Sequence, residues 1–291
     1  MNTPSLAELQ SILKTAIPIA HGAGAILREG LKHIATSQIN YKSNETDPVT
    51  EYDHKGEAYI VAALKQHFPT HKIVGEEGGA YEVLSPESSV HSDRSSMIKD
   101  LALRPQHSFE WQIDPLDGTV NFAHGFPWFS VSMGLLCAGQ PVAGVVYQPM
   151  MDDTFSAILG GGAQRNGWPI HVSKTQPLSK ALLNTGFPYD RRTSLQNNFD
   201  QFVHFQRVSQ EVRRMGSAAL DCCMVACGCM DGYWEMKIKP HDIAAGMLIV
   251  REAGGSVTDF SGGDAILAKQ QIVASNGLIH AAMLQELSAF Q

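Results

Sequence analysis

The chain has few of the features that place a protein in a membrane or on a polyanion. None of its apolar runs approaches the roughly 18 residues of a membrane-spanning helix, and its first ten residues lack the basic and apolar regions of a secretory signal. Its 29 acidic side chains outnumber 22 basic ones, which gives a formal charge of −7, and no Lys- or Arg-rich block is present. We therefore expect a soluble, cytoplasmic protein that binds neither nucleic acid nor membranes directly.

Cysteine is also scarce, with five residues in 291, and four of them lie in the segment DCCMVACGCM. These four are Cys222, Cys223, Cys227 and Cys229. A zinc site is conceivable here, whereas a disulfide is geometrically awkward between such close neighbours. Because Cys223 and Cys227 stand four apart on an apolar helix, the spacing favours small buried core residues.

The remaining composition and patterning indicate a large mixed fold. Hydrophobic side chains make up 44% of the chain, enough to bury a sizeable core. From Phe109, short apolar strands alternate with Gly and Pro turns, which is typical of an antiparallel meander. After about Lys180, strands and helices alternate, as in an α/β protein. No repeat or low-complexity linker intervenes, so we predict one α/β (α+β) unit over residues 1–291, with halves at 1–180 and 181–291.

Three segments of the first half carry more local predictions. Apolar residues at helical spacing over residues 6–20 predict an amphipathic helix, which Pro18 should kink or split. Thr50 and Asp53 fit a capping box at the start of the next helix. Residues 80–108 are rich in serine and show no clear period, so we expect a long exposed loop there.

The segment WQIDPLDGTVNF holds two carboxylates three positions apart, Asp114 and Asp117. They follow an expected strand, and Pro115 keeps the residue before it out of the helical region, so both side chains should project from a strand-end loop. Gly118 permits a tight turn, and Thr119 can begin a helix or turn whose backbone N–H groups face outward. The pattern indicates a carboxylate pair beside an anion cradle.

Several known carboxylate arrangements do not fit this spacing. An EF-hand alternates its ligands over twelve residues and closes with a glutamate. The aspartyl-phosphate enzymes use D-x-D rather than D-x-x-D, and an aspartic protease would need a second D-G-T, which the chain lacks. Oxygen ligands of this kind suit magnesium, which binds one or two carboxylates and shares phosphate oxygens with water. The alternative is a polar turn that caps a helix.

Other acidic residues stand where they could join this pair. Glu76 and Glu77 lie between two glycines at another expected strand end, and Asp242 begins a helix whose N-terminal dipole stabilises its charge. Taken singly, a Gly-Glu-Glu turn or an aspartate at a helix start is structural more often than functional. Their importance depends on their appearing together with the central segment.

That combination closely resembles the inositol monophosphatase family of magnesium-dependent, lithium-sensitive phosphatases. The resemblance rests on WQIDPLDGTVNF, on GEE upstream and on KPHDIAAG and EAGG downstream, in this order, and it extends from Asp47 to Gly255. It implies a layered α-β-α-β-α sandwich of the inositol monophosphatase and fructose-1,6-bisphosphatase type, and usually a homodimer. Residues 1–180 would then be the half that carries most metal ligands.

The resemblance also implies a set of metal ligands, with two or more Mg²⁺ ions per site. Glu76, Asp114 and the backbone carbonyl of Leu116 would hold one ion, while Asp114, Asp117 and Asp242 would hold a second. Two such ions can clamp a phosphate, one activating water and the other stabilising the leaving alkoxide.

Catalytic roles follow from the same resemblance. Thr119 would orient the nucleophilic water through its hydroxyl, Asp47 would polarise that hydroxyl, and Glu76 would assist from the metal side. The backbone N–H groups of Gly118 and Thr119 would bind the phosphate.

Substrate contacts are implied by two further segments. RRMGSAALD is similar to the family's G-T-A segment, so Gly216, Ser217 and Ala218 should line the polyol pocket, together with Asp242. In YWEM, Glu235 stands where the family accepts hydrogen bonds from ring hydroxyls. The alternative for Glu235 is a solvated strand residue.

The chain departs from the family in two places. His241 replaces the usual Trp before the last aspartate, where it could alter packing or pH dependence without removing a ligand. The segment between Glu76 and Asp114 is longer than in most relatives and could be a lid, an interface element or a disordered loop.

The most direct prediction is hydrolysis of myo-inositol 1-phosphate, a small phosphorylated polyol. Within the same fold, fructose-1,6-bisphosphatase, histidinol phosphatase and the 3′-phosphoadenosine phosphatases remain alternatives. The last group resembles D-G-T-K-E-F, whereas this chain has DGTVNF, and Asn121 with Glu235 favours inositol. A different class of function is a regulatory role through binding another protein, since some bacterial relatives also contact transcription or RNA machinery.

Overall fold

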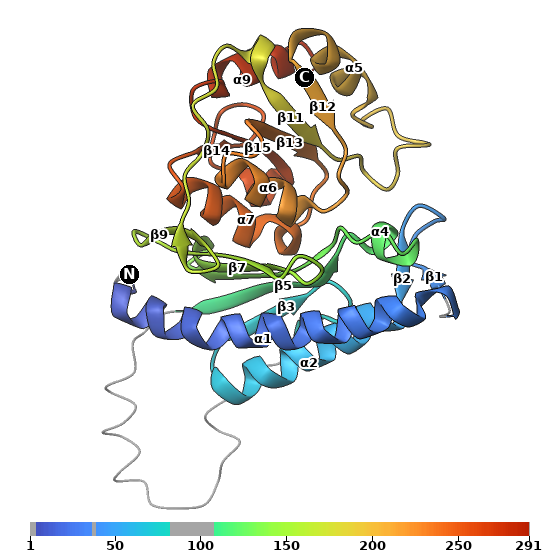
Figure 1. The fold of residues 1–291 in the computed structure, drawn as a ribbon, viewed down its shortest axis with the longest axis vertical. Helices are drawn as coiled ribbons and strands as arrows, with labels where there is room; N and C mark the ends of the chain where they lie inside the picture. The colour runs from blue at the N-terminus through green and yellow to red at the C-terminus, as the bar shows by residue number, and fades with distance from the viewer. Residues whose placement is uncertain (1–3, 37–38, 82–107, 291) are drawn as a thin grey trace, which may run out of the picture.

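A computed structural model describes residues 4–36, 39–81 and 108–290. In these residues helices and sheets alternate in five layers: two long helices, a large sheet, two central helices, a smaller sheet and an outer pair of helices (Figure 1). The predicted layered α-β-α-β-α fold is thereby confirmed. The predicted loop at 80–108 lies almost wholly outside the described residues.

The first layer consists of α1 (Leu6–His33) and α2 (Glu51–His67). The predicted helix is present, and the predicted split at Pro18 is wrong, because α1 runs through that residue. Buried residues on both sides of the proline, such as Ala16 and Ala20, hold the two parts of the helix on one face of the large sheet. Packing thus outweighs the hydrogen bond that proline removes.

The capping box predicted for α2 is confirmed. The Thr50 hydroxyl accepts from the backbone N–H of Tyr52 at 3.2 Å, and the Thr50 N–H donates to Asp53 Oδ2 at 2.8 Å. These contacts satisfy donors that a helix start leaves without partners. The short strands β1 (Ile39–Tyr41) and β2 (Pro48–Thr50) form a separate antiparallel pair that leads into the helix.

The second layer is an eight-stranded sheet in the order β10-β9-β8-β7-β6-β5-β3-β4. From β5 to β10 each strand pairs antiparallel with the next, which confirms the predicted meander, while β3 pairs parallel with β5. The strands are β3 (Lys72–Gly75), β4 (Gly79–Tyr81), β5 (Phe109–Asp117), β6 (Ser130–Cys137), β7 (Gln140–Gln148), β8 (Asp153–Ile158), β9 (Gly162–Arg165) and β10 (Trp168–Pro169).

The central helices, α6 (Ala218–Ala226) and α7 (Pro240–Glu252), cover the other face of this sheet. Glycines in the sheet allow the α7 backbone to approach closely. A Cβ atom added to Gly144 of β7 would lie 2.9 Å from the Cα of Ala245, and one on Gly134 of β6 would lie 2.8 Å from that residue's N. The distance between α7 and the sheet, and hence the position of the N-terminus of α7, depends on the absence of a side chain at these two glycines.

A five-stranded sheet in the order β12-β11-β13-β15-β14 forms the fourth layer. It is mixed, because β11 is parallel to β12 and β13 whereas β15 is antiparallel to its neighbours, and the predicted alternation of strands and helices is confirmed. Its strands are β11 (Leu182–Thr185), β12 (Glu211–Arg213), β13 (Gly232–Met236), β14 (Ser256–Thr258) and β15 (Gln271–Ser275).

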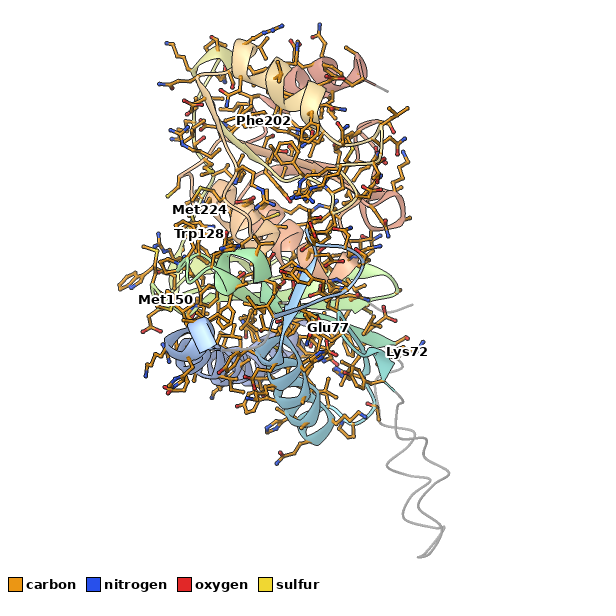
Figure 2. The ribbon with its side chains drawn as sticks, turned by 90° about the vertical axis from the view of Figure 1, so that its right-hand side faces the viewer. Lys72, Glu77, Trp128, Met150, Phe202 and Met224 are labelled. Carbon is orange, nitrogen blue, oxygen red and sulfur yellow. The ribbon has the colours of Figure 1, made fainter. Side chains whose placement is uncertain are left out.

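Helices α5 (Phe199–Val208) and α9 (His280–Ser288) form the outer layer, in which Phe202 is labelled (Figure 2). In the same view Met224 of α6 and Trp128 lie at the level of the central helices, and both belong to one apolar cluster. The shorter elements are α4 (Thr119–Ala123), α8 (Ile266–Lys269) and the 3-10 turns η1 (Ile34–Thr36) and η3 (Leu178–Lys180).

The cysteine-rich segment lies on α6 and the turn after it. Cys222 and Cys223 are fully buried in the core, as predicted, and Cys227 is half-buried. Cys229 is exposed, so the prediction of a buried residue is wrong there, because the helix has already ended at Ala226. Among the described residues, no helix is long and apolar enough to cross a membrane.

The close approach of α7 to the sheet gives a stability prediction. Gly144→Ala places a methyl group against the α7 backbone and should lower the free energy of unfolding by about 1–3 kcal/mol. Gln164→Ala, at an exposed position of the same sheet, is the matched control and should change it by less than about 0.5 kcal/mol. Urea unfolding measures both, and equal stabilities for the two variants would contradict this packing.

Candidate active site

The predicted site residues converge on one cleft of about 280 Å³. Its lining comes from the end of β5, from the starts of α6 and α7, and from β13 of the small sheet. All of the residues predicted from the sequence line it: Asp47, Glu76, Asp114, Leu116, Asp117, Gly118, Thr119, Gly216, Ser217, Ala218, Glu235 and Asp242.

The two central carboxylates belong to β5 itself, which corrects the expectation that they follow the strand in a loop. Asp114 pairs with Ser132 and Asp117 with Ser130, so the register shifts between them. Pro115 lies in this bulge, where a residue without an N–H can be accommodated. The bulge lets both carboxylates line the same cleft although they are three residues apart.

Asp117 is held by the start of α6. Its carboxylate accepts from the backbone N–H groups of Ala218 at 3.1 Å and Ala219 at 2.8 Å, and from the Ser217 hydroxyl. Burial raises the pKa of Asp117 to about 6, although these hydrogen bonds oppose the rise. A helix N-terminus favours negative charge, so α6 stabilises the ionised form.

Asp114 is buried among other carboxylates. It is 2% exposed, and its Oδ1 accepts from the backbone N–H of Leu116 at 2.9 Å. Burial raises the pKa of Asp114 well above its usual range, and the nearby charges of Glu76, Asp117 and Asp242 add to this effect. The four carboxylates therefore repel one another, and a cation among them would relieve that repulsion.

Glu76 has a basic partner that the sequence analysis missed. Lys42 Nζ lies 2.7 Å from Glu76 Oε1 and also contacts Glu77, which Figure 2 labels. Burial acts to raise the pKa of Glu76, but the charge and hydrogen bond of Lys42, together with the charge of His241 and a hydrogen bond to Asp114, outweigh it, so the pKa is lowered. No spacing or motif distinguished this lysine, because it lies 34 residues before its partner.

Asp242 is the third residue of α7. Its Oδ2 accepts from the backbone N–H of Lys239 at 2.8 Å, within the predicted helix start. His241 Nε2 lies 3.5 Å from Asp242 Oδ1, so the residue that departs from the family's pattern is adjacent to a predicted ligand. Burial lowers the pKa of His241, which favours the neutral ring.

The partner of the Thr119 hydroxyl differs from the one predicted. Thr119 Oγ1 lies 3.0 Å from Asp53 Oδ1 and 3.0 Å from the Leu116 carbonyl oxygen. Asp47 instead accepts from the Ser43 hydroxyl at 2.7 Å, so the predicted contact between Asp47 and Thr119 is wrong. The sequence pattern identified Asp53 as a capping residue, and the structure shows that its second oxygen is free to reach Thr119.

The end of the cleft on β13 holds Glu235. This residue is 9% exposed and accepts from the Tyr233 hydroxyl at 2.6 Å, so it is not the solvated strand residue of the alternative interpretation. Burial raises the pKa of Glu235 to about 7. Gly186 passes so close that a Cβ there would lie 2.1 Å from Glu235 Oε2, and a side chain at position 186 would displace the carboxylate.

The donor atoms around the four carboxylates suit a hard divalent cation. Glu76, Asp114, Asp117, Asp242 and the Leu116 carbonyl all offer oxygen, which magnesium prefers. Within the described part of the chain, no three His, Cys, Asp or Glu side chains are already arranged around a single metal position. Lys42 and the start of α6 satisfy several of these oxygens in the arrangement seen here.

The fold and this cleft define the class of protein to which the sequence motifs pointed. A sequence model described as the inositol monophosphatase family matches residues 8–291, and the chain belongs to this family. Over 286 residues it is 42% identical to inositol-1-monophosphatase of Synechocystis sp., covering 98% of this chain and 91% of that protein. It is also 39% identical to Nus factor SuhB of Pseudomonas aeruginosa, covering 95% of each chain.

Solved structures show the same fold. Inositol monophosphatase from Anabaena is 40% identical and superimposes with a TM-score of 0.80, covering 97% of this chain and 96% of that one. The extragenic suppressor protein suhB from Bartonella henselae is 33% identical, with a TM-score of 0.81, and covers 95% of this chain and 98% of that one.

The contact between Asp53 and Thr119 gives a prediction about catalysis. Asp53→Asn should lower the kcat of phosphate release by about 10²- to 10⁴-fold, because the amide no longer polarises the Thr119 hydroxyl as a carboxylate does. Asp47→Asn is the matched control and should lower kcat by less than tenfold. A larger loss in the Asp47 variant would contradict the assignment. Thermal unfolding of both variants separates this effect from a weakened helix cap.

Proposed function

We propose that this protein hydrolyses myo-inositol 1-phosphate to inositol and inorganic phosphate, with two or more Mg²⁺ ions. The observation that carries the proposal is the convergence of four carboxylates on one cleft, where burial and mutual repulsion favour a bound cation. Relatives of about 40% identity that are named inositol-1-monophosphatase support the reaction and the substrate class. The predicted ligand sets are Glu76, Asp114 and the Leu116 carbonyl for one ion, and Asp114, Asp117 and Asp242 for another.

The bound Mg²⁺ would supply a lowered pKa for the attacking water and charge stabilisation for the leaving alkoxide. The chain's own groups position the reactants. Because the Thr119 hydroxyl donates to Asp53, its lone pairs remain free to accept a hydrogen bond from the water and orient it toward phosphorus. Glu76 lines the same cleft and would accept the proton that the water releases.

The phosphate and the polyol would bind at opposite sides of the Asp117 carboxylate. The backbone N–H groups of Gly118 and Thr119 would bind the phosphate, and Gly118 has a positive φ of 102° that glycine adopts readily. Glu235 would accept hydrogen bonds from ring hydroxyls, and the turn Gly216–Ala218 would pack against the ring. In-line attack by water releases the alcohol directly, without a covalent phosphoenzyme.

The choice of inositol over related substrates rests on Glu235 rather than on Asn121. Asn121 Nδ2 donates to the carbonyl oxygens of Trp128 at 2.7 Å and Met215 at 2.9 Å, so its amide holds two loops together. Asn121 therefore gives no physical basis for the predicted preference for inositol. Fructose 1,6-bisphosphate and other sugar or polyol phosphates remain the alternative substrates.

A second candidate function is a regulatory role through a protein partner. It is favoured by the relatives named Nus factor SuhB, which match this chain over nearly its whole length. An acidic chain is a poor ligand for nucleic acid, so a protein surface is the more suitable partner. Pull-down with a catalytically inactive variant would separate this role from hydrolysis.

The proposal also covers the domain organisation and the oligomeric state of the protein. We propose one structural unit over residues 1–291, and contacts such as that of Asp117 with α6 support the association of its two halves. A homodimer, a cytoplasmic location and inhibition by lithium are expected from the family resemblance. Sedimentation analysis would measure the oligomeric state, and a monomer at micromolar concentration would contradict the dimer.

The substrate prediction is tested by phosphate release from a panel. Inositol 1-phosphate should be hydrolysed faster than fructose 1,6-bisphosphate, histidinol phosphate or 3′-phosphoadenosine 5′-phosphate, and EDTA or lithium should suppress the reaction. A magnesium-dependent preference for another compound would replace the substrate and keep the mechanism. No turnover of any compound would overturn the enzymatic proposal and favour the regulatory role.

The ligand assignment predicts that Asp117→Asn abolishes turnover, because the variant loses the charge that would bind Mg²⁺. The amide would also face N–H groups of α6, so a lower melting temperature is expected alongside the loss. Asp242→Asn is a matched variant, because it removes the same negative charge from the proposed ligand set. Asp242 accepts from the N–H of Lys239 at the start of its own helix, whereas Asp117 accepts from the N–H groups of a different element. Retained activity in both folded variants would reject the ligand set.

A further inference from the structure

The cleft contains a buried carboxyl that the proposed metal and phosphate sites leave unused. Asp221, in the first turn of α6, is 1% exposed and lines the cleft together with Glu235 and Arg214. Its Oδ1 atom has no hydrogen-bond partner among the described residues. Burial raises the pKa of Asp221 well above its usual range, and the charge of Glu235 adds to this effect, while the charge of Arg214 and the nearby side-chain amide of Asn184 oppose it.

The carboxyl of Asp221 is not needed to cap its helix. The N–H groups of Ala218 and Ala219 donate to Asp117, and that of Leu220 lies 3.4 Å from the Ser217 hydroxyl. The N–H of Asp221 itself donates to the Ser217 carbonyl at 2.9 Å. The first turn is therefore satisfied without this side chain, and a buried carboxyl that lines a cleft and has one oxygen without a partner points to a ligand group as that partner.

The neighbouring Glu235 differs from Asp221 in this respect. Its Oε2 already accepts from the Tyr233 hydroxyl, and the backbone of Gly186 lies against the carboxylate. Arg214 lowers the pKa of both acids, so its positive charge offsets part of their negative charge. This balance suits a neutral group rich in hydroxyls better than a cationic one.

We propose that Asp221 is a specificity-determining residue that accepts a hydrogen bond from a hydroxyl of the substrate's polyol. The proposal rests on the proposed function. Asp221 stands three residues after Ala218, whose amide holds Asp117, and thus about 4.5 Å further along the helix axis. One rigid helix therefore fixes the spacing between the amide that holds Asp117, a proposed metal ligand, and the carboxyl that would contact the polyol.

The test compares two substrates in Asp221→Ala. The ratio of kcat/KM for myo-inositol 1-phosphate to that for 4-nitrophenyl phosphate, which lacks polyol hydroxyls, should fall by roughly 10- to 100-fold, mainly through KM for the inositol ester. Asp221→Asn keeps an acceptor oxygen and should recover at least part of this loss. Cys222→Ala is the matched control. Cys222 is on α6, like Asp221, but it is buried against Gly246 of α7 and does not line the cleft.

The outcomes separate this inference from the proposed function. Wild-type protein that hydrolyses both compounds, with variants that lose activity equally on each, would overturn the role of Asp221 and leave the proposed function standing. An unchanged ratio in Asp221→Ala would do the same. Wild-type protein that hydrolyses neither compound would overturn the proposed function, and one that hydrolyses the nitrophenyl ester alone would overturn both.

Discussion

The repulsion among buried carboxylates is the constraint on which the rest of this structure depends. Each acid is held in a different way: Asp117 by the N-terminal amides of α6, Glu76 by Lys42, and Asp242 by its place at the start of α7. Asp114 lies at the centre, and its pKa is raised by burial and by all three neighbours. A divalent cation is the group that would stabilise all four in the ionised form.

The fold brings these acids together from distant parts of the sequence. The bulge in β5 directs two of them into one cleft, and glycines in the large sheet admit α7 closely enough to supply a third. The small sheet contributes Glu235, on β13, to the same cleft. The same helix start that holds Asp117 continues to Asp221, so the proposed metal site and the proposed polyol contact would share one rigid element.

The sequence predicted the site well where chemistry is local and poorly where it depends on long-range contacts. Asp114, Asp117, Gly118 and Thr119 form one continuous motif, so their shared location could be inferred from spacing alone. The continuity of α1 through Pro18 could not be inferred from the sequence, because tertiary packing compensates for the lost hydrogen bond. Asp53 stands six positions after Asp47, with the short strand β2 between them, and the fold alone decides which of the two reaches Thr119.

The central claim is that this carboxylate cluster binds divalent cations, and calorimetric titration with Mg²⁺ tests it most directly. Wild-type protein should bind two or more ions per chain. Asp114→Asn, which removes the ligand shared by both proposed positions, should weaken binding at each by at least tenfold, with the variant still folded. Wild-type protein that binds no Mg²⁺, or a variant that binds it as well as the wild type, would contradict the account.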